Sequence, residues 1–254
     1  MNAVLEIIPL KISKDVDPGD KIDKIIADSI VSNKKNLQNG DIIVIAQKIV
    51  SKAEGQIIRL SSIKPSVYAM QLALMHKKDP RLVELIIRES RTIIRLSEGV
   101  IISETKHGFI CANAGIDQSN VKNSEYNALL LPEDPDKSAN EILKSLKERT
   151  KKNVAVIISD SFGRPFRNGQ TNVAIGIAGI EPMTSYIGKE DMYGKKLRVT
   201  EIAVVDELAS AAELIMGKSN RIPVVIIRGF NYRKGGINSS IKKLIRPKEK
   251  DIFR

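Results

Sequence analysis

The chain has 254 residues, a formal net charge of +11, 42% hydrophobic residues and only 4% aromatic residues. This length allows one large domain or two small lobes, with a core built mainly of Ile, Leu, Val and Ala. A single cysteine, Cys111, excludes an intrachain disulfide and a cysteine-rich zinc site. Two histidines, His76 and His107, leave little for a histidine-ligated metal or a Ser–His–Asp triad.

The sequence contains no apolar run that approaches the ~18 residues needed to span a bilayer. Its start, MNAVLEIIPLKI, lacks the charged region and the long apolar region of a signal peptide. We therefore expect a cytoplasmic protein without a membrane partner.

The positive charge has three explanations, namely small anionic substrates, a lysine-rich proteome and nucleic-acid binding. The lysines are spread along the chain, and neither an RNA-module signature nor basic–aromatic interleaving is present. We rank the three in the order given and expect no nucleic-acid partner.

The first half of the chain is expected to alternate strands and helices. Apolar residues at 22, 25, 26 and 30 predict a helix over 21–32, after a short strand that ends at Pro9. The β-branched run 42–50 predicts a buried strand, and 51–66 a loop with a short strand. Helices are predicted over 66–75 and 80–90, followed by a hairpin-like pair of strands in 92–116 that turns at His107-Gly108.

The second half begins with a loop over 118–137 and a helix from Ser138 to about Thr150. A strand over 153–160 is expected to end at Asp160, before a polar loop over 161–172. The Gly-spaced run 173–180 predicts close backbone packing. The remaining expectations are a strand over 200–205, a helix capped by Asp206 and ended by Gly217, and a strand over 222–229.

These elements indicate an α+β fold of mixed sheets and packed helices, with an irregular α/β arrangement as the alternative. No internal repeat or long linker is visible. Residues 1–241 are therefore expected to form one unit, which could comprise two interleaved lobes. Residues 242–254 are expected to form a charged, loosely held tail.

The segment NAGIDQSN (113–120) places Asp117 and Asn120 three residues apart, after a Gly that breaks an apolar run. Oxygen ligands at such a turn suit Mg²⁺ or Mn²⁺ held jointly with phosphates. An Asx turn with a helix cap is the alternative.

A second polar cluster, SDSFGRPFR (159–167), combines Asp160, Ser161, Arg164 and Arg167. Open sheets place ligand-binding carboxylates at strand ends, and Arg recognises phosphate oxygens. The alternative is a surface loop with solvated arginines. Together the two clusters suggest metal-assisted phosphoryl chemistry. The sequence nevertheless has no GxxxxGK[ST], no GxGxxG after the first strand and no GxSxG.

Lys48 and Lys52 follow a predicted strand, where they either meet a phosphate or are simply solvated; Lys11 carries a weaker signal of the same kind. Asp206 and Glu207 form either a helix cap or a third carboxylate site.

Several segments together resemble the coenzyme F420-0:L-glutamate ligase family, the F420:γ-glutamyl ligases, where F420 is a deazaflavin coenzyme. The resemblance runs collinearly from about residue 5 to 232, and its motifs are IIPLKI (7–12), GDIIVIAQKIVSKAEGQIIRL (40–60), NAGIDQSN with LLLPEDPDKSA (113–139), VAVIISDSFGRPFRNGQTNVAIGIAGI (154–180), DMYGKKL (191–197) and VVDELASAAELIMGKSNRIPVVIIRG (204–229).

The resemblance implies a GTP-dependent amide ligase that joins L-glutamate to coenzyme F420-0 and then adds a second glutamate through a γ-linkage. It also implies two Mg²⁺ or Mn²⁺ ions per subunit, K⁺, a homodimer, and an α+β fold unlike P-loop or ATP-grasp enzymes. An acyl phosphate is the expected intermediate. The alternative is a ligase of this family that acts on another acidic acceptor.

Matched to the family's motifs, the first metal falls on Asp117 and Asp160, and the second on Ser161. Lys218 stands where relatives can offer an acidic or amide ligand to the second metal, so that metal's coordination is left open. No general base is identified, and Glu54 and Glu207 are the candidates. The implied nucleotide contacts are Ile8, Pro9, Leu10, Lys11, Gln47, Lys48, Lys52, Asn120, Met216, Gly217, Lys218, Ser219, Asn220, Arg221, Ile222 and Pro223.

Overall fold

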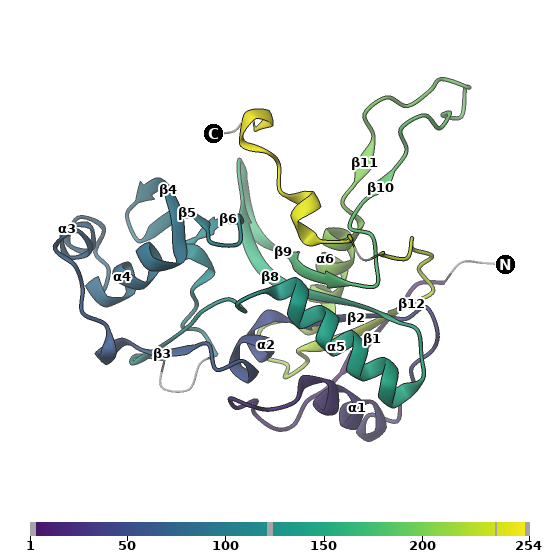
Figure 1. Ribbon diagram of the computed structural model, residues 1–254, viewed down its shortest axis with the longest axis horizontal. Coiled ribbons are helices and arrows are strands. Elements are labelled where there is room, and N and C mark those ends of the chain that lie inside the picture. The colour runs from purple at the N-terminus through teal and green to yellow at the C-terminus, as the bar shows by residue number, and fades with distance from the viewer. Residues whose placement is uncertain (1–3, 121–123, 237, 252–254) are drawn as a thin grey trace.

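The computed structural model describes residues 4–120, 124–236 and 238–251, and a five-stranded mixed sheet forms its centre (Figure 1). The β2–β8 pair is parallel and the other three pairs are antiparallel. The apolar runs of β2, β12 and the first half of β8 are buried, as expected for strands covered on both faces. In spatial order the strands are β1 (Glu6–Leu10), β12 (Val224–Arg228), β2 (Ile42–Ala46), β8 (Ala155–Arg164) and β9 (Arg167–Ala178).

Helices cover both faces of this sheet (Figure 1). Helix α5 (Pro135–Thr150) lies on one face with α1 (Ile22–Ser32) packed beside it, and α6 (Val204–Met216) lies on the other. A Cβ added to Gly176 of β9 would come within 2.4 Å of the Pro135 carbonyl oxygen. The close backbone packing predicted for this segment is thus confirmed at the contact between β9 and α5.

A bulge in β9 changes which face its side chains meet. Ile158 pairs with Gly176, but the next residue, Ser159, pairs with Ala174, so Ile175 is an extra residue. Gly176 therefore faces α5, whereas Asn172 reaches Glu213 of α6. Bulges of this kind often re-aim side chains next to functional sites.

A smaller module, residues 57–116 with β7 (Asn127–Leu129), has a hydrophobic core of its own. It contains α3 (Val67–His76) and α4 (Pro80–Glu89), whose N-termini are capped by Ser66 and Asp79. Both helices confirm the prediction. The expected pair of strands is a three-stranded sheet, and the module's strands are β3 (Ile57–Arg59), β4 (Ser90–Ser97), β5 (Val100–Thr105) and β6 (Ile110–Ala112).

Several boundaries differ from the sequence-based expectation. Strand β7 and the start of α5 at Pro135 both fall within the predicted loop 118–137. The strand predicted over 42–50 ends at Ala46, where α2 (Gln47–Ala53) begins. The polar loop predicted over 161–172 is instead the tip of the β8–β9 hairpin, so Asp160 lies within a strand and not at its end. Helix α6 begins at Val204 after a two-residue strand, and its N-cap is Ala203 rather than Asp206.

Two segments leave the body of the molecule. Residues 186–200 extend from the short strands β10 (Thr184–Ser185) and β11 (Glu201–Ile202) as a projecting arm (Figure 1). The tail contains the 3-10 helices η3 (Ile241–Leu244) and η4 (Lys248–Lys250). The first part of the predicted tail 242–254 is anchored rather than loose, because Lys243 pairs with Glu181 at 2.8 Å and Leu244 and Ile245 pack against the core.

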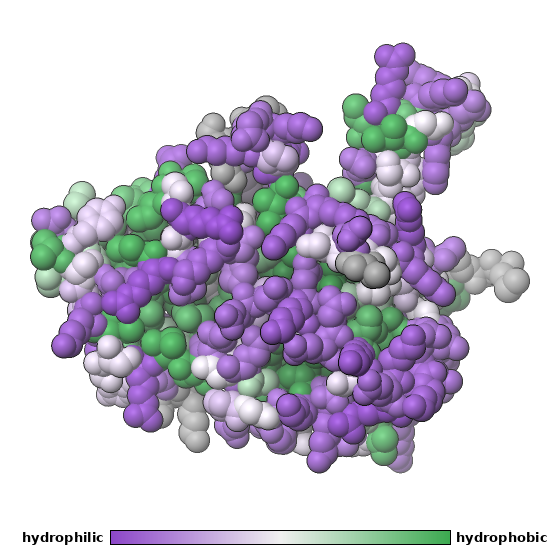
Figure 2. All heavy atoms as spheres, viewed as in Figure 1, coloured by the Kyte–Doolittle hydropathy of each residue, from purple (hydrophilic) through white to green (hydrophobic). Residues whose placement is uncertain are grey.

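The face shown in Figure 2 is mainly hydrophilic over α1 and α5, with apolar residues visible over the smaller module. Among the described residues, no helix is both long and apolar enough to cross a membrane. Helices and mixed sheets together confirm the predicted α+β fold.

Candidate active-site cleft

A cleft of about 860 Å³ lies between the central sheet and the smaller module. Its walls come from the segment 12–16 after β1, from α2, from residues 111–120, from the β8–β9 hairpin, and from residues 216–223 at the end of α6 and beyond it. The structure thereby brings together every described residue predicted for the nucleotide and the metals, except four. Ile8, Pro9 and Leu10 belong to β1 and Lys11 follows them, and these four are not among the described residues that line the cleft.

A strained turn presents Asp117 to the cleft. Asn113, Ala114 and Gly115, which form the 3-10 helix η2 (Asn113–Gly115), all have φ between 53° and 72°. A left-handed conformation costs a non-glycine residue roughly 1–2 kcal/mol. A Cβ on Gly115 would also lie 2.8 Å from the side chain of Leu131. The glycine break expected from the sequence is therefore required both by backbone conformation and by packing.

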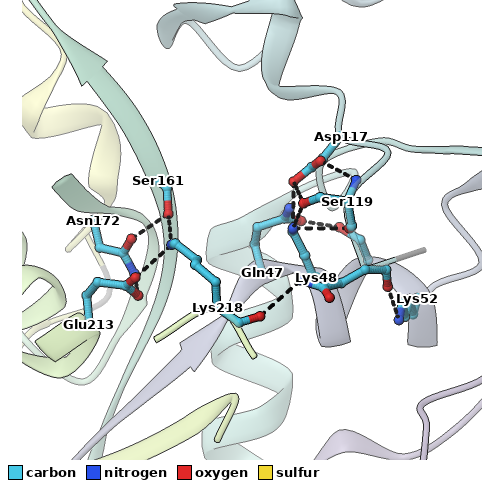
Figure 3. A network of polar contacts seen from close by, with 11 residues as sticks. Gln47, Lys48, Lys52, Asp117, Ser119, Ser161, Asn172, Glu213 and Lys218 are labelled. Carbon is cyan, nitrogen blue, oxygen red and sulfur yellow. Dashed lines mark hydrogen bonds and ion pairs between the residues drawn. The ribbon is translucent and has the colours of Figure 1, made fainter. Parts of the chain in front are cut away.

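Asp117 makes an Asx turn and an ion pair at the same time (Figure 3). Its Oδ1 accepts the backbone N–H of Ser119 at 2.6 Å, so the Asx turn of the sequence-based alternative is present, but Asp117 caps no helix among the described residues. Its Oδ2 lies 2.6 Å from the Lys48 Nζ. Burial alone would raise the pKa of Asp117, but the hydrogen bonds from Lys48 and Ser119 outweigh it and hold the pKa below its ordinary value. The carboxylate is therefore ionised and faces a cation.

Lys48 and Lys52 lie one turn apart on α2, which places both ammonium groups on one side of the helix. The Lys48 Nζ donates to the Ser119 hydroxyl at 2.6 Å, and the Lys52 Nζ donates to the Asn120 carbonyl at 2.9 Å. Burial lowers the pKa of Lys52. The two lysines tie α2 to the turn that carries Asp117.

Gln47 begins α2 and is buried, with 1% of its surface exposed. Its Oε1 accepts the hydroxyl of Ser51, but its Nε2 has no hydrogen-bond partner among the described residues. An unpaired buried donor is costly. Because Gln47 lines the cleft, this amide is suited to an acceptor oxygen from a ligand.

Asp160 is half-buried in β8 and faces the same cleft. Burial raises its pKa to about 6; the N–H of Ser161 opposes this rise, and the negative charge of Asp117 adds to it. Lys48 and Lys218 lower the pKa through their charges, but no ion pair among the described residues includes Asp160. This carboxylate is thus suited to an additional cation.

A four-residue network occupies the opposite wall (Figure 3). The Ser161 hydroxyl donates to Asn172 Oδ1 at 2.6 Å, and Asn172 Nδ2 donates to Glu213 Oε2 at 3.1 Å. The Lys218 Nζ completes the network by lying 2.6 Å from Ser161 Oγ and 2.7 Å from Glu213 Oε1. Reasoning from sequence missed Asn172 and Glu213. For Asn172 the missed signal was the hairpin register, which pairs it with Ser161.

Three other candidates lie outside this arrangement. Arg164 and Arg167 are exposed at the hairpin tip and are not among the cleft-lining residues that the structure describes. They are solvated, as the alternative expected, but they lie in β8 and β9 rather than in a loop. Asp206 accepts the N–H of Ala174 at 2.9 Å and so joins α6 to β9. The cap interpretation of Asp206 is therefore wrong, and Asp206 is not among the described residues that line the cleft.

The two candidate bases do not reach the cleft within the described structure. Glu54 accepts the hydroxyl of Ser138 at 2.5 Å and so joins α2 to the start of α5. Glu207 is exposed in the first turn of α6. The carboxylates that do line the cleft are Asp15, Asp117, Asp160 and Glu213.

The carboxylates present suit a metal that shares its ligands with a phosphate. No group of three or more His, Cys, Asp or Glu residues able to bind a metal is found in the described part of the chain. Asp117 and Asp160 offer two carboxylates, and Mg²⁺ is commonly held by one or two carboxylates together with phosphates and water. The pair therefore fits a divalent cation that binds together with a nucleotide.

The chain is similar to known proteins along most of its length. The family model described as F420-0:Gamma-glutamyl ligase matches residues 11–229. A protein of Methanothermobacter thermautotrophicus, named Coenzyme F420:L-glutamate ligase, is 50% identical over 240 residues, which are 94% of each chain. Proteins with the same name from Methanocaldococcus jannaschii and Methanopyrus kandleri are 47% identical over 86% and 43% identical over 98% of each chain. The chain therefore belongs to the F420-0:γ-glutamyl ligase family.

Proposed function

We propose that this protein is a coenzyme F420:L-glutamate ligase of coenzyme F420 biosynthesis. It joins L-glutamate to coenzyme F420-0 and then adds a second, γ-linked glutamate, with GTP as co-substrate. Support comes from family membership and from relatives of that name that match over almost their full length. The observation that carries the proposal is the cleft in which Asp117 and Asp160 meet Lys48 and Lys52.

The proposed reaction passes through an acyl phosphate, because a carboxylate and an amine do not condense in water without activation. A carboxylate oxygen of the acceptor attacks the γ-phosphorus of GTP, and the bond between that phosphorus and the bridging oxygen breaks to release GDP. The amine of glutamate then attacks the acyl carbon, phosphate leaves with the bonding pair, and the amine loses a proton to a base that the described residues do not identify.

In this proposal α2 and the loop 216–223 bind the nucleotide. The Lys48 and Lys52 ammonium groups face the phosphates, and the unpaired Gln47 amide donates to an acceptor oxygen. Asp117 and Asp160 hold Mg²⁺ or Mn²⁺, which neutralises negative charge on the phosphates when bound. Contacts from residues 8–11 require a nucleotide that extends beyond the cleft toward β1. K⁺ and a homodimer remain part of the proposal.

The test is mass spectrometry of the product formed from coenzyme F420-0, GTP and L-glutamate with Mg²⁺ or Mn²⁺, with GDP release measured in parallel. We expect mass increments of one and then two glutamyl groups. Asp117→Asn should abolish ligation while the circular dichroism spectrum is kept. Asp28→Asn, at an exposed position of α1, is the matched control and should retain activity.

Near-wild-type ligation by Asp117→Asn would refute the role of that carboxylate. If the wild-type protein adds no glutamate to coenzyme F420-0 but ligates glutamate to another acidic acceptor, the assignment of coenzyme F420-0 as acceptor is refuted. The assignment as an amide ligase would still stand. Ligation with ATP but not GTP would refute the nucleotide assignment.

A further inference from the structure

We propose that the Lys218 ammonium group takes the place of a second divalent cation beside Ser161, so that each subunit binds one divalent cation rather than two. This inference rests on the proposed function, because it concerns how the ligase site holds positive charge. It concerns Ser161, Glu213 and Lys218, which all line the cleft.

The geometry places the ammonium between the oxygens that a second cation would need. The Lys218 Nζ lies 2.6 Å from Ser161 Oγ and 2.7 Å from Glu213 Oε1. A lysine ammonium has three donors and no lone pair, so it binds these oxygens as a cation but cannot serve as a ligand. Asn172 bonds to both Ser161 and Glu213 and completes the ring of contacts.

The surrounding backbone holds Lys218 in this position. Gly217 ends α6 with φ of 55°, and a Cβ there would lie 2.7 Å from the side chain of Asn220. The Lys218 carbonyl accepts the Asn120 side-chain amide at 3.2 Å. The chain direction at residue 218 is therefore set by contacts on both sides of the cleft, and the side chain points to Ser161 (Figure 3).

The local balance of charge differs between the two possible cation positions, one beside Ser161 and one beside Asp117 and Asp160. Beside Ser161, the single negative charge of Glu213 is matched by Lys218. On the other wall, Asp117 is paired with Lys48, and Asp160 forms no ion pair among the described residues. A divalent cation is thus attracted to Asp117 and Asp160, whereas one placed beside Ser161 would meet the Lys218 ammonium at close range and be repelled.

The consequence is a site that holds positive charge in two ways. One divalent cation binds and exchanges, and the Lys218 ammonium group supplies a single positive charge that is always present. Lys218 would face the phosphates from the β8 side while the divalent cation faces them from the Asp117 side. Because an ammonium has no coordination geometry to satisfy, it supplies charge at any concentration of metal.

The experiment counts Mn²⁺ bound to the full-length protein with a non-hydrolysable GTP analogue, by equilibrium dialysis and electron paramagnetic resonance. We expect one Mn²⁺ per subunit, with the spectrum of an isolated ion. Lys218→Gln should raise the count to two and give the spectrum of a spin-coupled pair, as in two-metal sites about 3.5–4 Å apart. Adding Glu213→Gln should return the count to one. Lys195→Gln, exposed on the arm, is the matched control and should bind one.

Two Mn²⁺ ions per wild-type subunit would overturn the inference and leave the ligase function standing. A count that stays at one in Lys218→Gln would also overturn it, because the lysine would then not be what excludes the second ion. No bound Mn²⁺ while the nucleotide analogue is retained would overturn both this inference and the metal dependence of the proposed function. Thermal unfolding of each variant verifies that it is folded.

Discussion

Replacing Asp160 by Asn should stabilise the metal-free protein above about pH 6 and at the same time abolish ligation. Burial raises the pKa of this carboxyl from 3.8 to about 6. A carboxyl whose pKa is higher in the folded than in the unfolded chain binds its proton more tightly when folded, so its ionisation destabilises the fold. That destabilisation is absent below about pH 3.8, grows as the pH rises, and is complete above about pH 6.

The magnitude follows from the same pKa values. Raising a carboxyl pKa from 3.8 to about 6 corresponds to about 3 kcal/mol of unfolding free energy. Asp160 is only half-buried, which reduces this value, so we expect a gain of about 1–3 kcal/mol for Asp160→Asn at pH 8. At about pH 4 and below, where the wild-type carboxyl is protonated in the folded protein, the two proteins should have nearly equal stability.

The assay is urea unfolding with EDTA at about pH 4 and pH 8, with the linear slope verified to be unchanged. Asp41→Asn is the informative contrast, because Asp41 is also buried but both of its oxygens lie 2.8 Å from nitrogens of Arg228. Breaking that pair should cost about 3–5 kcal/mol at pH 8. A less stable Asp160→Asn protein at pH 8 would refute the reasoning, since it would mean that surrounding cations already stabilise the ionised carboxylate.

Three further predictions concern packing, a buried ion pair and charge. Gly176→Ala should lower the unfolding free energy by about 1–3 kcal/mol or more, because its Cβ would overlap the Pro135 carbonyl, whereas Gly163→Ala has open space and should be near neutral in urea unfolding. Arg228→Met should cost about 3–5 kcal/mol in the same assay, since it leaves Asp41 buried and unpaired, and a loss under 1 kcal/mol would contradict this. Raising salt from about 0.1 M to 1 M shortens the screening length from about 10 Å to 3 Å and should increase the apparent KM for GTP and glutamate; a constant KM would assign the +11 charge to proteome bias.

The fold was predictable where local pattern and tertiary contact agree. The strands 42–46 and 224–228 have continuous apolar runs and are buried in the central sheet. Helix α2 was missed because Ile49 and Val50 continue the β-branched run of β2. As a helix, the same segment lets Lys48 and Lys52 reach the turn at 117–120, which lies about seventy residues later in the chain. In this segment the tertiary contacts of Lys48 and Lys52 therefore outweigh the strand preference of the β-branched residues.

The two polar clusters around Asp117 and Asp160 were predictable from the sequence. The contacts that join the second cluster to α6 were not. Asp117 and Asp160 stood out because each combines with polar neighbours after an apolar run. Glu213 did not, because it lies on a helix with mixed neighbours and meets Asn172 only through packing of α6 on β9. Sequence spacing carries no information about such a contact, which joins residues 41 positions apart.

Ion pairs between its own side chains hold the walls of the site in place without a ligand. The Lys48–Asp117 pair joins α2 to the 113–120 turn. The Lys218–Glu213 pair joins the loop after α6 to α6 itself, and the hydrogen bond from Lys218 to Ser161 joins that loop to the β8–β9 hairpin. Both pairs are partly exposed, so each adds little to the stability of the fold. Their value is positional, because they hold cations and carboxylates on opposite walls of the cleft. Among the described residues of the proposed ligase, Asp160 is the cleft carboxylate that forms no ion pair, so an incoming divalent cation gains most beside it.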